Sequence, residues 1–351
     1  MQNIIHVTGS YYEVGLQIGQ NSKEAMHNIV QPLQRFQFLK KNYADCAALQ
    51  KMKERAQTLF PKYCEELQGI ADGAEMSFDD VFLWNCRGDL PKDKDDDIET
   101  AGCTDVLIAG KNGQGSIIAH NEDGNADFLE YSFIVDATYS EDGQEHRIES
   151  FAYPGLLIGH TFGVNSHGLV LTVNHLPWFE QREDVPRHFI CRAILDCKTQ
   201  KEAVAVIENY PSSGGFNYNI GQTGVETLLS VEAPTGSSET VIVTDRFTHA
   251  NHCIAPAHAT LSKDTQGSTM HRQQRAEELL PEIEPTIAGA LSILFDRDDN
   301  DLPILRDASG VDKGVATIMT AVFTLQQDSV HWTIYNSATQ SEMHTGRFDI
   351  L

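Results

Sequence analysis

The spacing of apolar residues changes abruptly near residue 103, and this change constrains the fold more than any other feature of the sequence. Residues 12–41 and 46–74 carry apolar residues at helical spacing, and residues 76–83 form a shorter helical pattern capped by Ser77. From residue 103 onward, short segments rich in β-branched and aromatic residues alternate with Gly, Asn and Asp turns. We therefore expect a helical first segment followed by a region of many short strands.

Helical patterns return only twice in the strand-rich region, at residues 186–209 and 268–283. The chain then closes with two strand patterns at residues 315–325 and 329–337. An order of helices, then many antiparallel-looking strands with helices between them, is typical of packed sheets with helical outer layers. The sequence therefore predicts an α+β protein of this layered kind.

The composition argues against several classes of partner. A formal net charge of −24 over 351 residues would repel the phosphates of nucleic acids and anionic lipid surfaces, so we expect no nucleic-acid or membrane partner. No apolar run approaches the roughly 20 residues of a membrane helix, and the first residues do not resemble a signal peptide. Seven cysteines without a CxxC pair indicate no disulfide framework, and we expect a cytoplasmic protein.

Cys103 stands directly after Ala101-Gly102, at the end of an acidic, turn-rich run and at the start of an apolar strand pattern. If the Gly102–Cys103 bond were cut, Cys103 would carry a thiol and a free α-amine on one residue. The α-amine has a reference pKa of about 7.7–8.0 and the thiol one of about 8.5, so the amine can act as a general base near neutral pH.

The thiol of Cys103 could also make that cut itself. Attack of sulfur on the Gly102 carbonyl gives a thioester, and water then releases the new amine; glycine tolerates the strained backbone that such an attack requires. The alternative from these residues alone is an ordinary buried cysteine.

Several further motifs bear on this choice. They are GSYYEVGLQIG at 9–19, LWNCRGDL at 83–90, AGCT at 101–104, HNED at 120–123, FGVNSHGLVLTVNHLP at 162–177, THANHC at 248–253 and HRQQRAEELL at 271–280. In this order and spacing the chain resembles the autoproteolytic acyltransferase and hydrolase family of N-terminal-nucleophile enzymes, which includes isopenicillin-N acyltransferase and the β-alanyl-amine hydrolases. More distantly it resembles choloylglycine hydrolases.

This resemblance implies a four-layer αββα sandwich, in which two antiparallel sheets lie between helical layers. It also implies that the chain cuts itself before Cys103 into residues 1–102 and 103–351, which stay together as one globular unit. The helical first piece would then be the partner of the catalytic second piece. We expect no cofactor and no metal.

The resemblance also assigns roles to four residues. Cys103 would be the nucleophile and, through its own amine, the base. Asp123 matches the family's N-x-D aspartate, which would orient the terminal ammonium and tune its pKa. Asn174 and Asn251 match two positions that face the scissile carbonyl, where an amide N–H is an oxyanion donor. Without the resemblance, all three polar residues would be read as turn residues.

One family feature is missing from the sequence. The family usually carries an arginine just before a late strand of the type T-x-x-x-x-x-aromatic, which here is TIMTAVF at 317–323. Lys313 is the nearest cation and Arg306 lies further back, so we expect one of them to contact the substrate. Lysine does not reproduce a bidentate guanidinium, which leaves the family's contact uncertain at this point.

Two other signals are weaker than they look. His249, His252, Cys253 and His258 have near-ligand spacing, but they surround Asn251 and no second pair accompanies them, so we expect no metal there. Residues 296–307 resemble a calcium loop but lack glycine at the sixth position and end in Asp rather than Glu. No GxGxxG, P-loop or GxSxG element is present.

The sequence therefore predicts a self-processed cysteine enzyme that cleaves a linear, non-peptide amide through a thioester with Cys103. The first alternative is an acyl-coenzyme A-dependent N-acyltransferase of the same family, which a strongly acidic protein disfavours unless a local basic pocket compensates. The second is an uncut, non-catalytic binding protein, which the missing arginine favours. The third is a two-domain protein with a helical regulatory module before residue 89.

Overall fold

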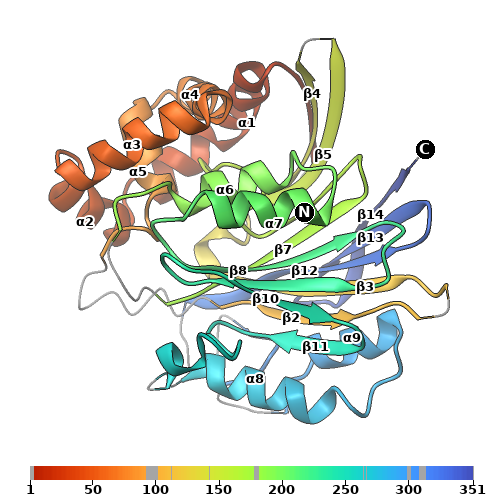
Figure 1. The fold of residues 1–351 in the computed structure, drawn as a ribbon. Helices are drawn as coiled ribbons and strands as arrows, with labels where there is room; N and C mark the ends of the chain where they lie inside the picture. The colour runs from red at the N-terminus through yellow and green to blue at the C-terminus, as the bar shows by residue number, and fades with distance from the viewer. Residues whose placement is uncertain are drawn as a thin grey trace.

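The computed structural model describes residues 4–91, 102–111, 113–141, 143–177, 182–263, 265, 267–298, 302–307 and 314–350. In these residues two β-sheets lie face to face, and helices cover the outer face of each sheet (Figure 1). No helix in the described ranges is both long and apolar enough to cross a membrane.

The larger sheet contains eight strands in the described residues, in the order β1-β4-β5-β6-β7-β8-β9-β10. Their bounds are β1 Ile4–Gly9, β4 Phe133–Glu141, β5 Gln144–Ala152, β6 Phe162–Asn165, β7 Leu169–His175, β8 Phe216–Gln222, β9 Leu228–Ala233 and β10 Glu239–Val243. Strands β6, β7 and β8 are buried at nearly every position because they are covered on both sides, although β8 alternates apolar residues with the buried Asn217 and Asn219.

The smaller sheet contains six strands in the order β11-β2-β3-β12-β13-β14. Their bounds are β2 Thr104–Ile108, β3 Ser116–Asn125, β11 Arg246–His249, β12 Val315–Leu325, β13 Ser329–Asn336 and β14 Ser341–Asp349. Strand β2 begins directly after Cys103, and its register places Thr104 opposite Asn121 of β3. Cys103 and the HNED segment therefore lie on neighbouring strands at one end of this sheet.

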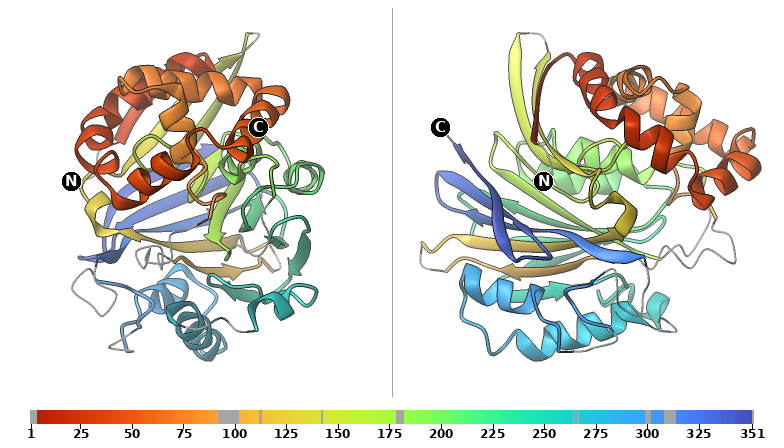
Figure 2. Two further views of the ribbon diagram at one scale, coloured as in Figure 1. Left: turned by 90° about the vertical axis from the view of Figure 1, so that its left-hand side faces the viewer. Right: turned by 180° about the vertical axis from the view of Figure 1, so that it is seen from behind.

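Helices form the two outer layers (Figures 1 and 2). The layer over the eight-stranded sheet consists of α1 Tyr11–Ala25, α2 Gln34–Tyr43, α3 Ala47–Leu59, α4 Pro61–Gly73, α5 Phe78–Asn85, α6 Arg187–Ile194 and α7 Gln200–Asn209. The layer against the six-stranded sheet consists of α8 Ser268–Leu279 and α9 Ile287–Leu294. The expected four-layer αββα arrangement is thus confirmed.

Local sequence signals explain several helix boundaries. Ser10 and Glu13 form a capping box at the start of α1, and Ser77 accepts the Asp80 N–H as the expected cap of α5. Pro61 occupies the first position of α4, where its missing N–H costs nothing, and so divides the long helical pattern of residues 46–74 into α3 and α4.

Two expectations about the sheets were wrong. The larger sheet is not purely antiparallel, because β1 pairs with β4 in parallel. These two strands are separated by the whole helical segment, so no hairpin forces them to run in opposite directions. The smaller sheet ends in a third C-terminal strand, β14, which the pattern did not predict because SEMHTGRFD is mostly polar and forms an edge.

A buried polar cluster joins the helical first segment to the rest of the fold. Arg192 of α6 is fully buried, and its guanidinium donates to Glu66 of α4 at 2.8 Å and to Asp196 at 2.7 Å. The same guanidinium lies over the rings of Tyr11 and Tyr63 from the first segment, at 5.4 and 4.9 Å. We call these residues the Arg192 cluster. It holds residues before and after position 102 in one core.

Candidate active site

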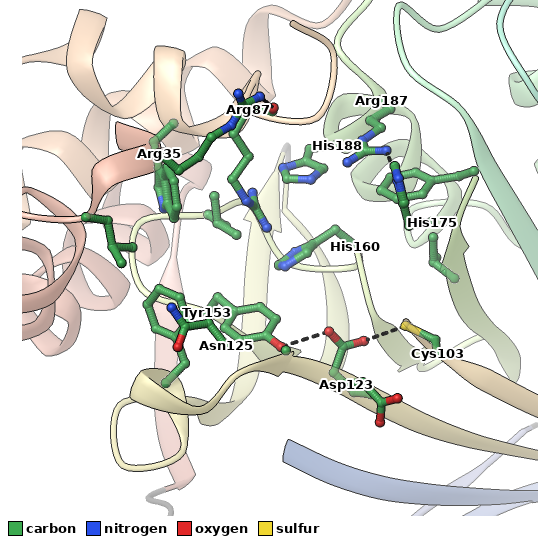
Figure 3. A pocket seen from close by; sticks show the side chains of 18 of the residues that line it. Arg35, Arg87, Cys103, Asp123, Asn125, Tyr153, His160, His175, Arg187 and His188 are labelled. Atoms are coloured by element: carbon green, nitrogen blue, oxygen red, sulfur yellow. Dashed lines mark hydrogen bonds between the residues drawn. The ribbon is translucent and has the colours of Figure 1, made fainter. Parts of the chain in front are cut away.

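A cavity of about 170 Å³ opens between the helical first segment and the end of the six-stranded sheet that carries Cys103 (Figure 3). Its floor carries Cys103, Glu122 and Asp123. Its opposite wall carries three arginines and three histidines. The cavity is therefore electrically polar, with carboxylates on one side and guanidinium groups on the other.

Cys103 is buried at the cavity floor, with 6% of its surface exposed. Its thiol donates to Glu122 Oε2 at 3.3 Å. Burial, together with the nearby Glu122 carboxylate, raises the pKa of the Cys103 thiol to about 12. In the uncut chain the sulfur is therefore a protonated thiol whose nearest proton acceptor is a carboxylate.

Glu122 is the centre of a buried hydrogen-bonded chain. Its Oε1 accepts from the Tyr153 hydroxyl at 2.8 Å, and its Oε2 pairs with His120 Nε2 at 3.3 Å. The other ring nitrogen of His120 pairs with Asp105 at 3.1 Å. Burial alone would lower the pKa of His120, but the charge of Asp105 and the hydrogen bonds raise it well above its usual value. The cationic ring can therefore hold the Glu122 carboxylate in place beside the sulfur.

Asp123 belongs to β3, lies near Cys103, and is 2% exposed. Its Oδ1 accepts from the Thr317 hydroxyl at 2.7 Å, while its Oδ2 makes no hydrogen bond. Arg306 Nη1 lies 3.7 Å from Oδ2. Burial raises the pKa of Asp123, and the charges of Arg306 and Arg272 oppose this shift. Asp123 thus offers one open acceptor atom at the cavity floor.

Arg306 and Lys313 were the two candidates for the missing family arginine. Arg306 is buried at 5% exposure and reaches the site through Asp123. Its backbone N–H also bonds the Thr317 hydroxyl at 2.9 Å, so the segment before β12 is fixed at that point. Lys313 lies outside the described residues.

Gly102 is enclosed by Asn251 and Arg272. A Cβ atom on Gly102 would lie 2.5 Å from Asn251 Oδ1 and 2.2 Å from Arg272 Nη2, so no side chain fits there. Arg272 of α8 donates from Nη1 to the Cys103 carbonyl and to Thr104 Oγ1, and from Nη2 to Asn251 Oδ1 at 2.9 Å. Asn251 in turn donates to the His175 carbonyl at 3.0 Å. The bond before Cys103 therefore sits in a rigid polar setting.

Asn174, the second expected oxyanion donor, has a different environment. Its Nδ2 donates to the carbonyls of His249 and Ala250, both at 2.9 Å, and its Oδ1 makes no hydrogen bond. Because both amide hydrogens are used on that segment, Asn174 in this state holds the backbone that carries Asn251. Its expected role at the scissile carbonyl stays a prediction.

The wall opposite Cys103 is formed by Arg35, Arg87 and Arg187, with His160 and His188 between them (Figure 3). Arg35 bonds the carbonyls of residues 87, 90 and 91 and so shapes the backbone there. Burial, with a contribution from Arg87, lowers the pKa of His160 to about 3. Burial and the neighbouring cations likewise lower the pKa of His188 well below its usual value. The histidines are therefore neutral and the arginines supply the charge.

Two clusters near the site contain residue types that can bind metal ions. The ligand atoms of Cys103, His120 and Glu122 lie within 4.8 Å of one another. However, both ring nitrogens of His120 already have carboxylate partners, Asp105 at 3.1 Å and Glu122 at 3.3 Å. In the second cluster His249 bonds Glu232 at 3.2 Å, and Glu232 also accepts the N–H groups of residues 254 and 255. Glu232 therefore anchors the Asn251 segment.

Sequence reasoning missed several residues of this site. Arg272 and Glu122 lie inside quoted motifs, HRQQRAEELL and HNED, but no role followed from their positions alone. Tyr153 and Arg187 belong to no motif and reach the cavity only through the fold. No local signal could have found them.

Known proteins can now be compared with this fold and site. A model of the acyl-coenzyme A:6-aminopenicillanic acid acyl-transferase family matches residues 108–339, more than half of the chain, and the chain belongs to this family. The resemblance expected from the motifs is thereby confirmed.

Two relatives show how the family varies. The β-alanyl-dopamine/carcinine hydrolase of Drosophila melanogaster is 29% identical over 226 residues, which cover 59% of this chain but only 57% of the relative. The acyl-coenzyme A:6-aminopenicillanic-acid-acyltransferase 40 kDa form of Emericella nidulans is 26% identical over 290 residues, 78% of this chain and 74% of the relative. A mutant conjugated bile acid hydrolase from Clostridium perfringens superposes with a TM-score of 0.45 and 11% identity, over 70% of this chain and 92% of that one.

Proposed function

We propose that the protein is a self-processing cysteine amidohydrolase, which cuts its own chain before Cys103 and then hydrolyses a linear, non-peptide amide. The observation that carries this proposal is the setting of the Gly102–Cys103 junction. Gly102 is enclosed by Asn251 and Arg272, and the sulfur of Cys103 stands at the floor of a cavity beside a carboxylate. The names of the two relatives, one a hydrolase and one an acyltransferase, support the same reaction class.

The first reaction is the cut. Glu122 takes the proton of the Cys103 thiol, and the sulfur attacks the Gly102 carbonyl carbon. The carbonyl carbon–nitrogen bond breaks, the proton passes to the departing nitrogen, and a thioester joins Gly102 to the sulfur. Water then hydrolyses the thioester, which leaves a carboxylate on Gly102 and both a thiol and an amine on Cys103. Asn251 and Arg272 lie beside Gly102, and we propose that they stabilise the negative charge that develops on its carbonyl oxygen.

The second reaction repeats this chemistry on the substrate. The new α-amine of Cys103 takes the thiol proton, so the enzyme no longer depends on Glu122 as base. The open Oδ2 of Asp123 is positioned to accept a hydrogen bond from the resulting ammonium. The sulfur forms a thioester with the acyl group, the protonated amine product leaves, and water releases the acid. Glu122 is thus the base of the first reaction, the α-amine of Cys103 is the base of the second, and Asp123 orients the ammonium in the second.

The two pieces, residues 1–102 and 103–351, would remain one unit after the cut. The Arg192 cluster supports this, because Glu66, Tyr11 and Tyr63 lie in the first piece and Arg192 in the second. Separating them would leave buried charges without partners, which typically costs about 3–5 kcal/mol. All seven cysteines are free thiols, which suits a reducing compartment such as the cytoplasm.

An acyl-coenzyme A-dependent acyltransferase is the second candidate, and one observation favours it. A net charge of −24 would repel a polyanion, but the arginine-rich wall of the cavity is a local basic surface of the kind that compensates. The two candidates share every step up to the thioester. Turnover of an amide in water against turnover of an acyl-coenzyme A with an amine acceptor separates them.

Mass spectrometry of the purified protein under denaturing conditions tests the proposal. We expect two fragments, ending at Gly102 and starting at Cys103. The Cys103→Ala variant should stay whole, while Cys64→Ala, which removes a free thiol far from the cavity, should be cut like the wild type. A wild-type chain that stays whole and binds ligands without turnover would favour the non-catalytic alternative and refute the proposal.

A further inference from the structure

We propose that the cavity wall opposite Cys103 binds a carboxylate carried by the substrate, through the guanidinium of Arg187 with Arg87 beside it. This inference rests on the proposed amidase function and narrows its substrate class to linear amides with a negatively charged end. The reacting carbonyl would lie at the Cys103 floor and the carboxylate at the arginine wall.

The guanidinium of Arg187 is held in a prepared recess. Glycines line it on two sides: a Cβ on Gly88 would lie 1.6 Å from Arg187 Nη2, and one on Gly214 would lie 2.9 Å from its Cδ. The guanidinium stacks on the ring of Phe216, with 4.1 Å between Cζ and the ring centroid. The two glycines make room for the guanidinium, and its stacking on Phe216 orients the fork.

The hydrogen bonds of Arg187 leave part of the fork unused. Its Nη1 donates to His175 Nδ1 at 2.6 Å and to the Gly215 carbonyl at 3.0 Å. The residue is only 5% exposed, and its Nε is buried and makes no hydrogen bond. A buried N–H without a partner is costly, and a carboxylate is the group that a planar guanidinium fork binds best.

The surrounding charges favour an anion. Figure 3 shows Arg87 and Arg187 on the same side of the cavity, and the Arg87 guanidinium carbon lies 4.8 Å from the ring centroid of Trp84. The histidines between them are neutral because burial lowers the pKa of both His160 and His188. Asp89 is the carboxylate that faces this group; its Oδ1 accepts the Arg187 backbone N–H at 3.0 Å.

The carboxylates at the cavity floor determine which end of the substrate lies near Cys103. Glu122 and Asp123 lie at the cavity floor with Cys103, so a carboxylate bound there would meet two like charges. A substrate whose end distant from Cys103 carries an ammonium would place that positive charge beside the guanidinium groups of Arg87 and Arg187. Only an amide whose anionic end points away from Cys103 satisfies both walls.

Three p-nitroanilides of equal length test this inference on the mature, cut enzyme: glutaryl, its neutral carboxamide analogue, and the cationic γ-aminobutyryl compound. A charge-assisted hydrogen bond predicts that kcat/KM for the glutaryl compound exceeds that for the neutral one by roughly 10- to 100-fold. Arg187→Gln should abolish this preference by raising KM for the glutaryl substrate far more than for the neutral one. A purely structural role would impair both substrates equally.

Further variants keep the test informative. Arg187→Lys keeps the charge but loses the fork, so part of the preference should survive. If Arg187→Gln does not fold, Arg87→Met should reduce the same preference. Arg347→Gln removes one exposed positive charge that pairs with Asp349, so it should leave the preference intact.

The outcomes also separate the two proposals. An uncut protein without amide turnover refutes the proposed function, and glutarate can then still be tested as a ligand of Arg187 by its effect on thermal unfolding. A cut, active enzyme with equal turnover of the three anilides, or with a preference for the cationic one, overturns the carboxylate site alone. A preference for acyl-coenzyme A that Arg187→Gln abolishes assigns the wall to phosphate and overturns the amide-carboxylate assignment.

Discussion

Replacing Gly102 with alanine tests whether the junction before Cys103 is built for cleavage. The new Cβ would lie 2.2 Å from Arg272 Nη2 and 2.5 Å from Asn251 Oδ1, well inside contact distance. Neither neighbour can move freely, because Arg272 is bonded to Thr104 and Asn251 to the His175 carbonyl. The strain must therefore displace a group that surrounds the carbonyl under attack.

The size of the effect follows from overpacking. Extra methyl groups in a well-packed interior cost about 1–3 kcal/mol, and about 1.4 kcal/mol corresponds to tenfold in rate. If this strain is relieved by moving Asn251 or Arg272, the Gly102→Ala chain should cut itself roughly 5- to 150-fold more slowly. Molecules that do cut should then hydrolyse amides normally, because their Cys103 is unchanged.

The assay is cell-free synthesis followed by denaturing gels at timed intervals. Gly143→Ala is the control, because Gly143 has a φ of 76° and no heavy atom within 4 Å of an added Cβ. It should cost folding stability through its backbone without slowing the cut. Cleavage of Gly102→Ala at the wild-type rate would refute the reasoning, since the enclosed junction would then play no part in the reaction.

Three other perturbations have defined outcomes. Arg192→Met leaves the buried Glu66 without its cation, while Asp196 keeps Lys62 at 2.8 Å, so the free energy of unfolding in urea should fall by about 3–5 kcal/mol; a loss below 1 kcal/mol would show that the cluster does not join the two segments. In the uncut chain the pKa of the Cys103 thiol is raised to about 12. In uncut Gly102→Ala molecules the rate of Cys103 alkylation by iodoacetamide should therefore keep rising up to pH 9, whereas in the cut protein this rate should reach its plateau at a lower pH. Burial raises the pKa of Asp89 from 3.8 to about 6, so the contribution of Asp89 to folding stability is full below pH 4 and is lost as the pH rises through 6. Asp89→Asn should therefore reduce the change in the free energy of unfolding between these pH values by about 3 kcal/mol. An unchanged pH profile of unfolding would contradict the assignment.

The sequence predicts most helices of this fold, because their signals are local, but it did not predict α9, Ile287–Leu294. The apolar spacing that defines α1 and α4 and the cap at Ser77 depend only on neighbouring residues. Strand β14 escaped because its residues are polar at a sheet edge, and β1 because its parallel partner β4 begins more than a hundred residues later. Long-range pairing of this kind leaves no periodic trace.

The residues of the site also fall into those that local motifs reveal and those that depend on long-range packing. Cys103, Asp123 and Asn251 stand in short motifs, and the structure brings all three around one junction. Arg272 and Arg187 reach the same cavity from α8 and α6, and their roles depend on recesses formed by glycines distant in the sequence. The orientation of Asn174 toward the 249–250 carbonyls likewise depends on a packing that no motif records.

Because Gly102 is enclosed only in the folded chain, formation of the active enzyme depends on completion of the fold. Arg272, Asn251 and Gly102 come together only when segments some 150 or more residues apart have packed against one another. Under the proposed scheme a misfolded or partly synthesised chain would keep its peptide bond intact and its sulfur inert. The ratio of cut to uncut chains in a preparation would then be a permanent record of how many molecules had ever reached the native state.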